Sequence, residues 1–167
     1  GLISEQDYLE TLGKSITNLM RSLGRMKQTV VEASWDAWIK YYRQDENSPN
    51  AIVSYYAKGA LIALALDLTL RGRTRGRVSL DDVMRRLWRE FGQPGRGVGE
   101  DDIRRIAEEA SGLDLRRFFR EAIEGTAELP LRRLLSDFGL ALEWEVQGKA
   151  PSLGVKARSE GSEVRLA

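Results

Sequence analysis

Apolar residues recur every three or four positions along most of the chain, which is the spacing of one buried face of an α-helix. The clearest example follows Ser4, which together with the acidic residues after it resembles a capping box. The apolar side chains of this segment are Leu9, Leu12, Ile16, Leu19 and Leu23. This pattern predicts a first helix that begins at Ser4 and ends near Gly24.

Several shorter helices are predicted downstream by the same spacing, with capping residues at their starts and glycines at their ends. Polar or glycine-rich connections separate them, notably 45–50, 71–77 and 92–99. The predicted helices are 34–42, 79–91, 100–112, 114–125 and 130–139, the last opened by Pro130.

The segment from Ile52 to Leu70 is apolar on nearly all sides, which predicts a central buried helix. Its length is close to that of a membrane span. Lys58 and Asp67 would then lie at membrane depth, where charges are costly. We therefore expect a buried core helix and no membrane contact.

The pattern changes after residue 138, where apolar and polar residues alternate in the manner of strands. Leu140, Leu142, Trp144 and Val146 alternate first, and Val164 and Leu166 do so after a predicted turn at 159–162. The sequence thus predicts a mainly α protein, a multi-helix bundle with a short C-terminal β segment. We divide the chain into a helical part, 1–138, and a β part, 139–167.

Composition narrows the classes of function. The chain has 167 residues, of which 42% are hydrophobic and 31% charged, as expected of a soluble globular protein. Its formal net charge of +1 provides no general attraction for nucleic acid or anionic membranes. Arginines 71, 73, 75 and 77 could contact phosphates non-specifically, but no aromatic residues lie among them for base stacking. We predict no nucleic-acid partner, with weak binding through this segment as an alternative.

The sequence contains neither cysteine nor histidine. Disulfides, thiolate nucleophiles, imidazole bases and Cys- or His-ligated zinc sites are therefore excluded from this chain. We predict no metal ligands in it. The lack of cysteine suits a reducing cytoplasm, which is slightly favoured, although secreted proteins can lack cysteine too.

The segment Tyr55-Tyr56-Ala57-Lys58-Gly59 places polar groups in the first turn of the most apolar predicted helix. Buried phenol and ammonium groups need hydrogen-bond partners. One interpretation has both tyrosines packing with their hydroxyls at the surface; the other has a phenol donating a hydrogen bond to an oxyanion. Gly59 lowers helix propensity, and close packing of another element would explain it.

Several stretches together resemble the glycyl aminopeptidase family, zinc peptidases that carry a PDZ domain. Tyr56, Lys58 and Gly59 are also similar to the Y-x-K-G motif of the wider zinc aminopeptidase group. The stretches that carry the resemblance are GLISEQDYL (1–9), EASWDAWIKYY (32–42), ENSPN (46–50), VSYYAKGALIALALDL (53–68), SLDDVMRRLWREFG (79–92) and EGTAELPL (124–131).

The resemblance implies a thermolysin-like catalytic domain, in which an H-E-x-x-H helix and a downstream Glu hold the zinc. It also implies that Tyr56 hydrogen-bonds the tetrahedral oxyanion, with weaker support for Tyr55 as a substrate-binding neighbour. Family substrates are peptides with a small N-terminal residue, glycine especially. Lys58 and Gly59 match the motif, and we expect structural roles for them.

The resemblance further predicts that this chain is a fragment, with the zinc ligands and general base upstream of Gly1 and a truncated PDZ-like start near Leu153. Its partners would be the peptide substrate and the remainder of the catalytic domain. Alone, the fragment is expected to be inactive. The rival hypothesis is a non-catalytic helical module that binds a partner protein through the aromatic residues Trp35, Trp38, Tyr41 and Tyr42.

Overall fold

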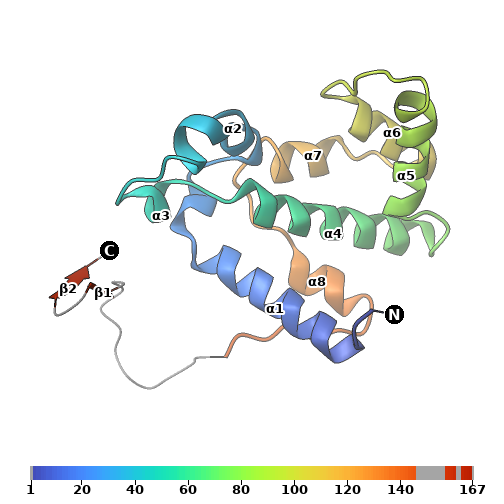
Figure 1. The fold of residues 1–167 in the computed structure, drawn as a ribbon. Coiled ribbons are helices and arrows are strands. Elements are labelled where there is room, and N and C mark those ends of the chain that lie inside the picture. The colour runs from blue at the N-terminus through green and yellow to red at the C-terminus, as the bar shows by residue number, and fades with distance from the viewer. Residues whose placement is uncertain (1, 146–156, 161–162, 167) are drawn as a thin grey trace.

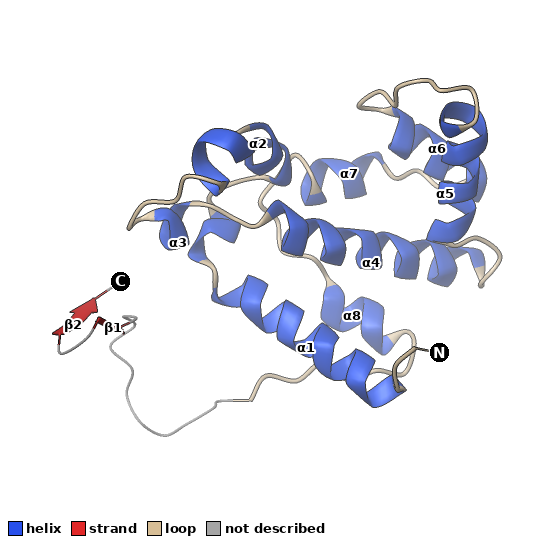
Figure 2. Ribbon diagram, viewed as in Figure 1, coloured by secondary structure: helices blue, strands red, loops and turns tan. Residues whose placement is uncertain are grey.

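The computed structural model describes residues 2–145, 157–160 and 163–166. The described residues are predominantly helical, as Figures 1 and 2 show. The α-helices are α1 (Glu5–Arg21), α2 (Val30–Trp35), α3 (Ser48–Ala51), α4 (Tyr55–Thr74), α5 (Leu80–Leu87), α6 (Asp102–Ser111), α7 (Arg116–Ala122) and α8 (Leu131–Ser136). The predicted helical bundle is thus confirmed.

Helix α1 begins where the sequence predicted. The side chain of Ser4 accepts a hydrogen bond from the backbone N–H of Asp7 at 3.1 Å, which satisfies one free donor of the first turn. Ile16 and Leu19 are buried on its inner face. A 3₁₀ turn, η1 (Leu23–Met26), follows directly.

The long helix α4 lies at the centre of the molecule, as predicted, but its bounds differ from 52–70. It begins at Tyr55 because the Ser54 side chain caps it, accepting from the N–H of Ala57 at 3.2 Å. It continues to Thr74, so the prediction of a loop over 71–77 is wrong for its first half. Arg71 extends the helix by pairing with Asp67, one turn earlier, at 2.8 Å.

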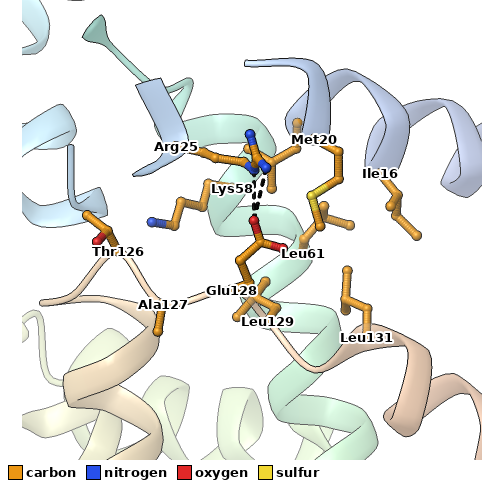
Figure 3. Close-up of a pocket in the computed structure, with 11 residues that line it drawn as sticks. Ile16, Met20, Arg25, Lys58, Leu61, Thr126, Ala127, Glu128, Leu129 and Leu131 are labelled. Carbon is orange, nitrogen blue, oxygen red and sulfur yellow. Dashed lines mark hydrogen bonds and ion pairs between the residues drawn. The ribbon is translucent and has the colours of Figure 1, made fainter. Parts of the chain in front are cut away.

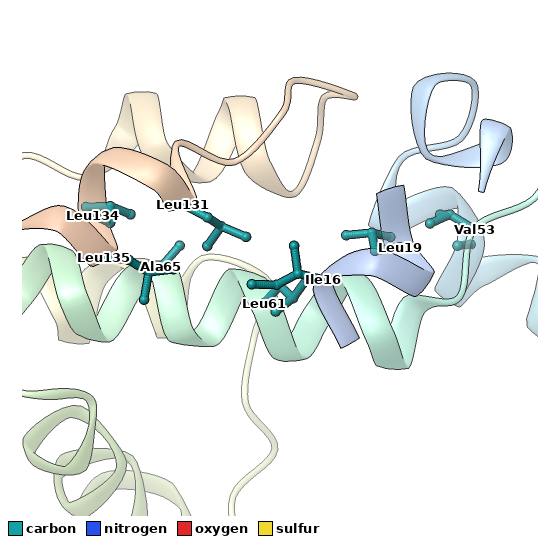
Figure 4. Close-up of a cluster of buried hydrophobic side chains, with 9 residues drawn as sticks. Ile16, Leu19, Val53, Leu61, Ala65, Leu131, Leu134 and Leu135 are labelled. Atoms are coloured by element: carbon teal, nitrogen blue, oxygen red, sulfur yellow. The ribbon is translucent and has the colours of Figure 1, made fainter. Parts of the chain in front are cut away.

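Two apolar clusters pack against different parts of α4. The first joins α4 to α1 and α8, as Figure 4 shows, and consists of Ile16, Leu19, Ala33, Val53, Leu61, Ala65, Leu131, Leu134 and Leu135. The second joins it to α5, α6 and α7, and consists of Leu66, Leu70, Val83, Ile106, Ala107, Leu115 and Phe119.

Ser48–Thr74 is the one helical stretch in the described part that is long and apolar enough to cross a membrane. Its packing in both clusters is that of a core helix.

Asp67 explains how a charge is accommodated on this apolar helix. Its Oδ1 accepts a hydrogen bond from the backbone N–H of Leu80 at 2.8 Å, and its Oδ2 accepts from Arg71. Ser79 just before α5 donates its own N–H to Asp82 at 2.9 Å. The carboxylate of Asp67 therefore fixes the start of α5 against α4.

Two predicted segments differ in detail. The helix predicted at 34–42 is α2 followed by a π-helical turn, η2 (Ala37–Tyr41), and α2 begins earlier because Thr29 and Glu32 form a capping box. The second half of the loop predicted at 45–50 is instead part of α3, with Pro49 in its first turn. A second π-helical turn, η3 (Trp88–Gly92), extends α5.

The predicted β segment is not confirmed as a whole. Residues 140–145 form no strand, although Leu140, Leu142 and Trp144 alternate as predicted. Leu140 and Leu142 instead pack against the first apolar cluster. The backbone further on contains two short antiparallel strands, β1 (Ala157–Glu160) and β2 (Glu163–Leu166). Val146 and the linker predicted at 148–152 lie outside the described residues.

Candidate functional site

Four tyrosines from two segments meet at the N-terminal end of α4. Tyr41 is the last residue of the π-helical turn η2 and Tyr42 follows it directly, whereas Tyr55 and Tyr56 occupy the first two positions of α4. The rings of Tyr55 and Tyr56 have centroids 4.3 Å apart, and that of Tyr41 lies 5.3 Å from Tyr55. Aromatic contacts at these distances favour packing, so the four rings form one cluster.

Three of the four hydroxyls are joined by hydrogen bonds. The Tyr42 hydroxyl lies 3.1 Å from that of Tyr55 and 3.1 Å from that of Tyr56. Tyr41 is outside this network, because its hydroxyl lies 3.3 Å from the Ser54 hydroxyl that caps α4. The hydroxyls of Tyr55 and Tyr56 therefore have the hydrogen-bond partners that the sequence analysis expected them to need.

Tyr55 and Tyr56 differ in exposure and acidity. Tyr56 is 60% exposed, whereas Tyr55 is half-buried. The hydrogen bond between Tyr42 and Tyr56 lowers the pKa of Tyr56 below its usual value of 10.0. The pKa of Tyr55 is raised instead, chiefly by its hydrogen bond to Tyr42. Of Tyr55 and Tyr56, the more acidic phenol is thus the more accessible one.

The segment that follows α1 holds in place the residues that lead into α4. The buried side chain of Gln28 accepts a hydrogen bond from the backbone N–H of Val53 at 3.0 Å. The hydroxyl of Ser22 donates to the carbonyl of Ile52 at 3.4 Å. Val53 is itself only 1% exposed, so this turn is held inside the core. These contacts set the place from which Ser54 and the two tyrosines start.

Lys58 points away from the tyrosines, since a residue two positions after Tyr56 is rotated by about 200° around a helix. It is 3% exposed, and its ammonium donates a hydrogen bond to the carbonyl of Gly125 at 3.5 Å. Burial lowers its pKa. Figure 3 shows it in a pocket beside the ion pair between Arg25 and Glu128, whose closest atoms are 3.0 Å apart. Lys58 therefore attaches the first turn of α4 to the segment between α7 and α8, which is a structural role.

Gly59 does not serve the close packing that the sequence suggested. A Cβ at this position would meet no heavy atom within 4 Å. Gly24 is the glycine where an element approaches closely, because a Cβ there would come within 1.9 Å of the Ile52 carbonyl oxygen.

No metal fits among the residues that the structure describes. Nowhere in the described part do three or more Asp, Glu, His or Cys side chains gather as a potential ligand set. The acidic side chains there are used as helix caps or as partners of arginines, for example Asp82 and Glu108. A zinc ion would need ligands from outside the described residues.

The sequence identified Tyr55 and Tyr56 but missed how Tyr42 relates to them. Tyr42 is 13 residues from Tyr55 and was interpreted only as part of an exposed aromatic surface. Tyr42, Trp35 and Trp38 are indeed exposed, whereas Tyr41 is half-buried. Adjacent tyrosines in both segments were the available signal, but only the fold brings the two pairs together.

Comparison with known proteins links the N-terminal part of the chain to a peptidase family. Residues 1–62, which include the first turn of α4 and all four tyrosines, match the M61 glycyl aminopeptidase family. This match supports the glycyl aminopeptidase family and confirms the resemblance found in the sequence. The PDZ-like part, which begins outside the described residues, stays a prediction.

A solved structure supports this family assignment over a longer stretch. The crystal structure of an aminopeptidase N family protein from Idiomarina loihiensis is 36% identical in sequence and superposes with a TM-score of 0.90. The alignment covers 99% of this chain and 30% of the Idiomarina chain, so this chain spans less than a third of the length of that relative. No curated protein matches the chain.

Proposed function

We propose that this chain is the helical C-terminal part of the catalytic region of a zinc aminopeptidase, in which Tyr56 stabilises the reaction's oxyanion. The observation that carries the proposal is the exposed Tyr56 hydroxyl at the N-terminus of α4, hydrogen-bonded to Tyr42 on one side and open on the other. A phenol at this place can donate its proton to a developing negative charge. The partial positive charge at the start of a 20-residue helix favours an anion there too.

Tyr56 fits this role better than Tyr55. Tyr56 is 60% exposed and its pKa is lowered, so its proton is both reachable and more readily shared. Tyr55 is half-buried and holds its proton more tightly. We assign Tyr55 to the wall of the substrate site.

Zinc would be held by residues outside this chain, which has no histidine. When bound, the metal in such peptidases polarises the scissile carbonyl and lowers the pKa of the attacking water. The substrates we propose are peptides with a small N-terminal residue, glycine in particular. The remainder of the catalytic region is then the partner that completes the site, and the division of the chain at 138/139 is part of the same proposal.

The chain alone should not hydrolyse peptides. The experiment measures release of p-nitroaniline from glycyl-p-nitroanilide, with added zinc, by this chain and by the longer protein that includes it. We expect turnover only from the longer protein, and we expect a zinc chelator to abolish it. Turnover by the isolated chain would refute the assignment as a fragment, and a longer protein that is inactive with zinc would refute the peptidase function.

The second candidate is a non-catalytic helical interaction module. It is favoured by exposed apolar side chains along α2 and the π-helical turn, where Trp35 is 86% exposed, Trp38 79% and Ile39 67%. Large exposed apolar surfaces commonly mark contacts. One pair of substitutions separates the two candidates. Replacing Trp35 and Trp38 by Ser should abolish partner binding by an interaction module. In the longer peptidase, the same change should lower activity only to the extent that folding depends on this surface.

A further inference from the structure

We infer that Tyr42 is a positioning residue that directs the Tyr56 hydroxyl outward by donating its own proton to it. The inference rests on the proposed role of Tyr56 and deepens it. It follows from the place of the Tyr42 hydroxyl, which is 3.1 Å from the hydroxyls of both Tyr55 and Tyr56.

Counting protons sets the direction of the hydrogen bonds. A phenol has one proton to donate and can accept hydrogen bonds on its oxygen. If Tyr56 donates outward to an oxyanion, it can only accept from Tyr42. Tyr42 has then used its single proton and can only accept from Tyr55. The chain of donors therefore runs from Tyr55 through Tyr42 to Tyr56 and ends at the open side.

Burial and acidity support this direction. The first donor in this series of hydrogen bonds is the half-buried Tyr55, and the last hydroxyl is that of the exposed Tyr56. A phenol that donates to a neighbour holds its proton more tightly, and one that accepts releases its proton more easily. The pKa of Tyr55 is raised and that of Tyr56 lowered, which is the order expected of the first donor and the last acceptor.

Packing holds Tyr42 in place for this role. Its ring lies 5.2 Å from that of Trp38 on one side and meets the ring of Tyr41 edge-on at 5.4 Å on the other. Its removal would leave Tyr56 free to turn its proton inward or toward water. Because Tyr42 is 52% exposed, water competes for its hydroxyl, so the expected effect is moderate.

The test on this chain is NMR titration of tyrosines labelled with ¹³C at the ζ carbon, with assignments from single Tyr→Phe variants. In the unchanged chain we expect the pKa of Tyr56 to lie below 10.0. Tyr42→Phe keeps the ring and removes the hydroxyl, and it should raise the pKa of Tyr56. Tyr41→Phe is the matched control, since its hydroxyl contacts Ser54 instead, and it should leave the pKa of Tyr56 in place. An unchanged Tyr56 pKa in Tyr42→Phe overturns the inference.

A kinetic test in the longer peptidase separates this inference from the proposed function. Tyr42→Phe should lower kcat roughly threefold to tenfold with little change in KM, less than the roughly 10²-fold loss of a whole oxyanion donor. If Tyr56→Phe lowers kcat and Tyr42→Phe does not, the positioning role fails and the proposed function stands. If Tyr56→Phe leaves kcat unchanged, the proposed function fails, whatever the titration shows.

Discussion

Gly24 lies directly against the backbone of Ile52, so that a Cβ on residue 24 would come within 1.9 Å of the Ile52 carbonyl oxygen. This contact joins the turn after α1 to the segment that leads into α4. Only a glycine fits there without moving one of the two backbones. The place of Tyr55 and Tyr56 thus depends on a residue about thirty positions away.

Gly24→Ala should therefore destabilise the fold. The clash is with backbone atoms, which cannot turn aside as a side chain can, and we expect a loss of about 3 kcal/mol in the free energy of unfolding. Urea denaturation followed by circular dichroism measures it. Gly13→Ala is the control, because no heavy atom lies within 4 Å of a Cβ at that position of α1. A Gly24→Ala protein as stable as the unchanged one would contradict the observed packing.

Gly59→Ala should stabilise the chain by about 1 kcal/mol. Gly59 lies inside α4 with open space around its Cβ position, so alanine gains helix propensity without a clash. Gly76→Ala is the contrasting variant. Open space surrounds Gly76 as well, but its φ of +76° strains any other residue, and we expect a loss of about 1 kcal/mol. Thermal unfolding of both variants compares the two effects, and a destabilised Gly59→Ala would show that something packs there.

Gln28→Met should cost about 1–3 kcal/mol, because the buried N–H of Val53 loses its only side-chain acceptor among the described residues. Methionine keeps much of the volume, so the loss reports the hydrogen bond more than the packing. Gln6→Met is the control, since Gln6 bonds Glu10 on the exposed face of α1 and should change stability by less than about 0.5 kcal/mol. Equal effects of the two variants would remove Gln28 from the support of α4.

Lys58 makes stability depend on pH at alkaline values. Burial lowers its pKa in the folded state below the unfolded value of 10.5, so the folded chain releases this proton first as the pH rises. In that interval the unfolded state binds more protons, and the free energy of unfolding rises with pH toward 10.5. The Lys58→Met variant lacks this titrating group, so its free energy of unfolding should not include this rise. The unchanged chain should therefore gain stability relative to the variant as the pH rises toward 10.5.

Urea unfolding at a series of pH values between neutrality and 10.5 measures this difference. Met20→Leu is the control, because it changes the apolar wall of the same pocket without a titrating group. Its difference from the unchanged chain should stay constant with pH. A constant difference for Lys58→Met as well would mean that the buried ammonium keeps its usual pKa.

The sequence predicted the helical class because each amphipathic segment carries its own periodicity and caps. Ser4 shows how local this information is, since it caps α1 through a residue three positions later. The extension of α4 to Thr74 was missed because it depends on the pairing of Arg71 with Asp67, and on Arg75 adopting a left-handed conformation with φ of 57°. Apolar alternation at 140–145 suggested a strand, but Leu140 and Leu142 pack on helices without a pairing partner.

The candidate site was predictable in part. The motif identified Tyr56, because the resemblance is carried by adjacent residues of one helix turn. Tyr42 and Gln28 could not be connected to it from the sequence, since each acts across more than ten positions through a contact that only the folded chain makes. Residues that support a site from another element are invisible to local patterns for this reason.

The most direct test of the account is the activity of Tyr56→Phe in the longer peptidase. Removing the hydroxyl while keeping the ring should lower kcat for glycyl-p-nitroanilide roughly 10²-fold, with KM changed little, as for the loss of one oxyanion donor. Tyr41→Phe, whose hydroxyl contacts Ser54 and not Tyr56, should retain most of the activity. A Tyr56→Phe enzyme with unchanged kcat would contradict the central claim, because the exposed phenol at the start of α4 would then take no part in the reaction.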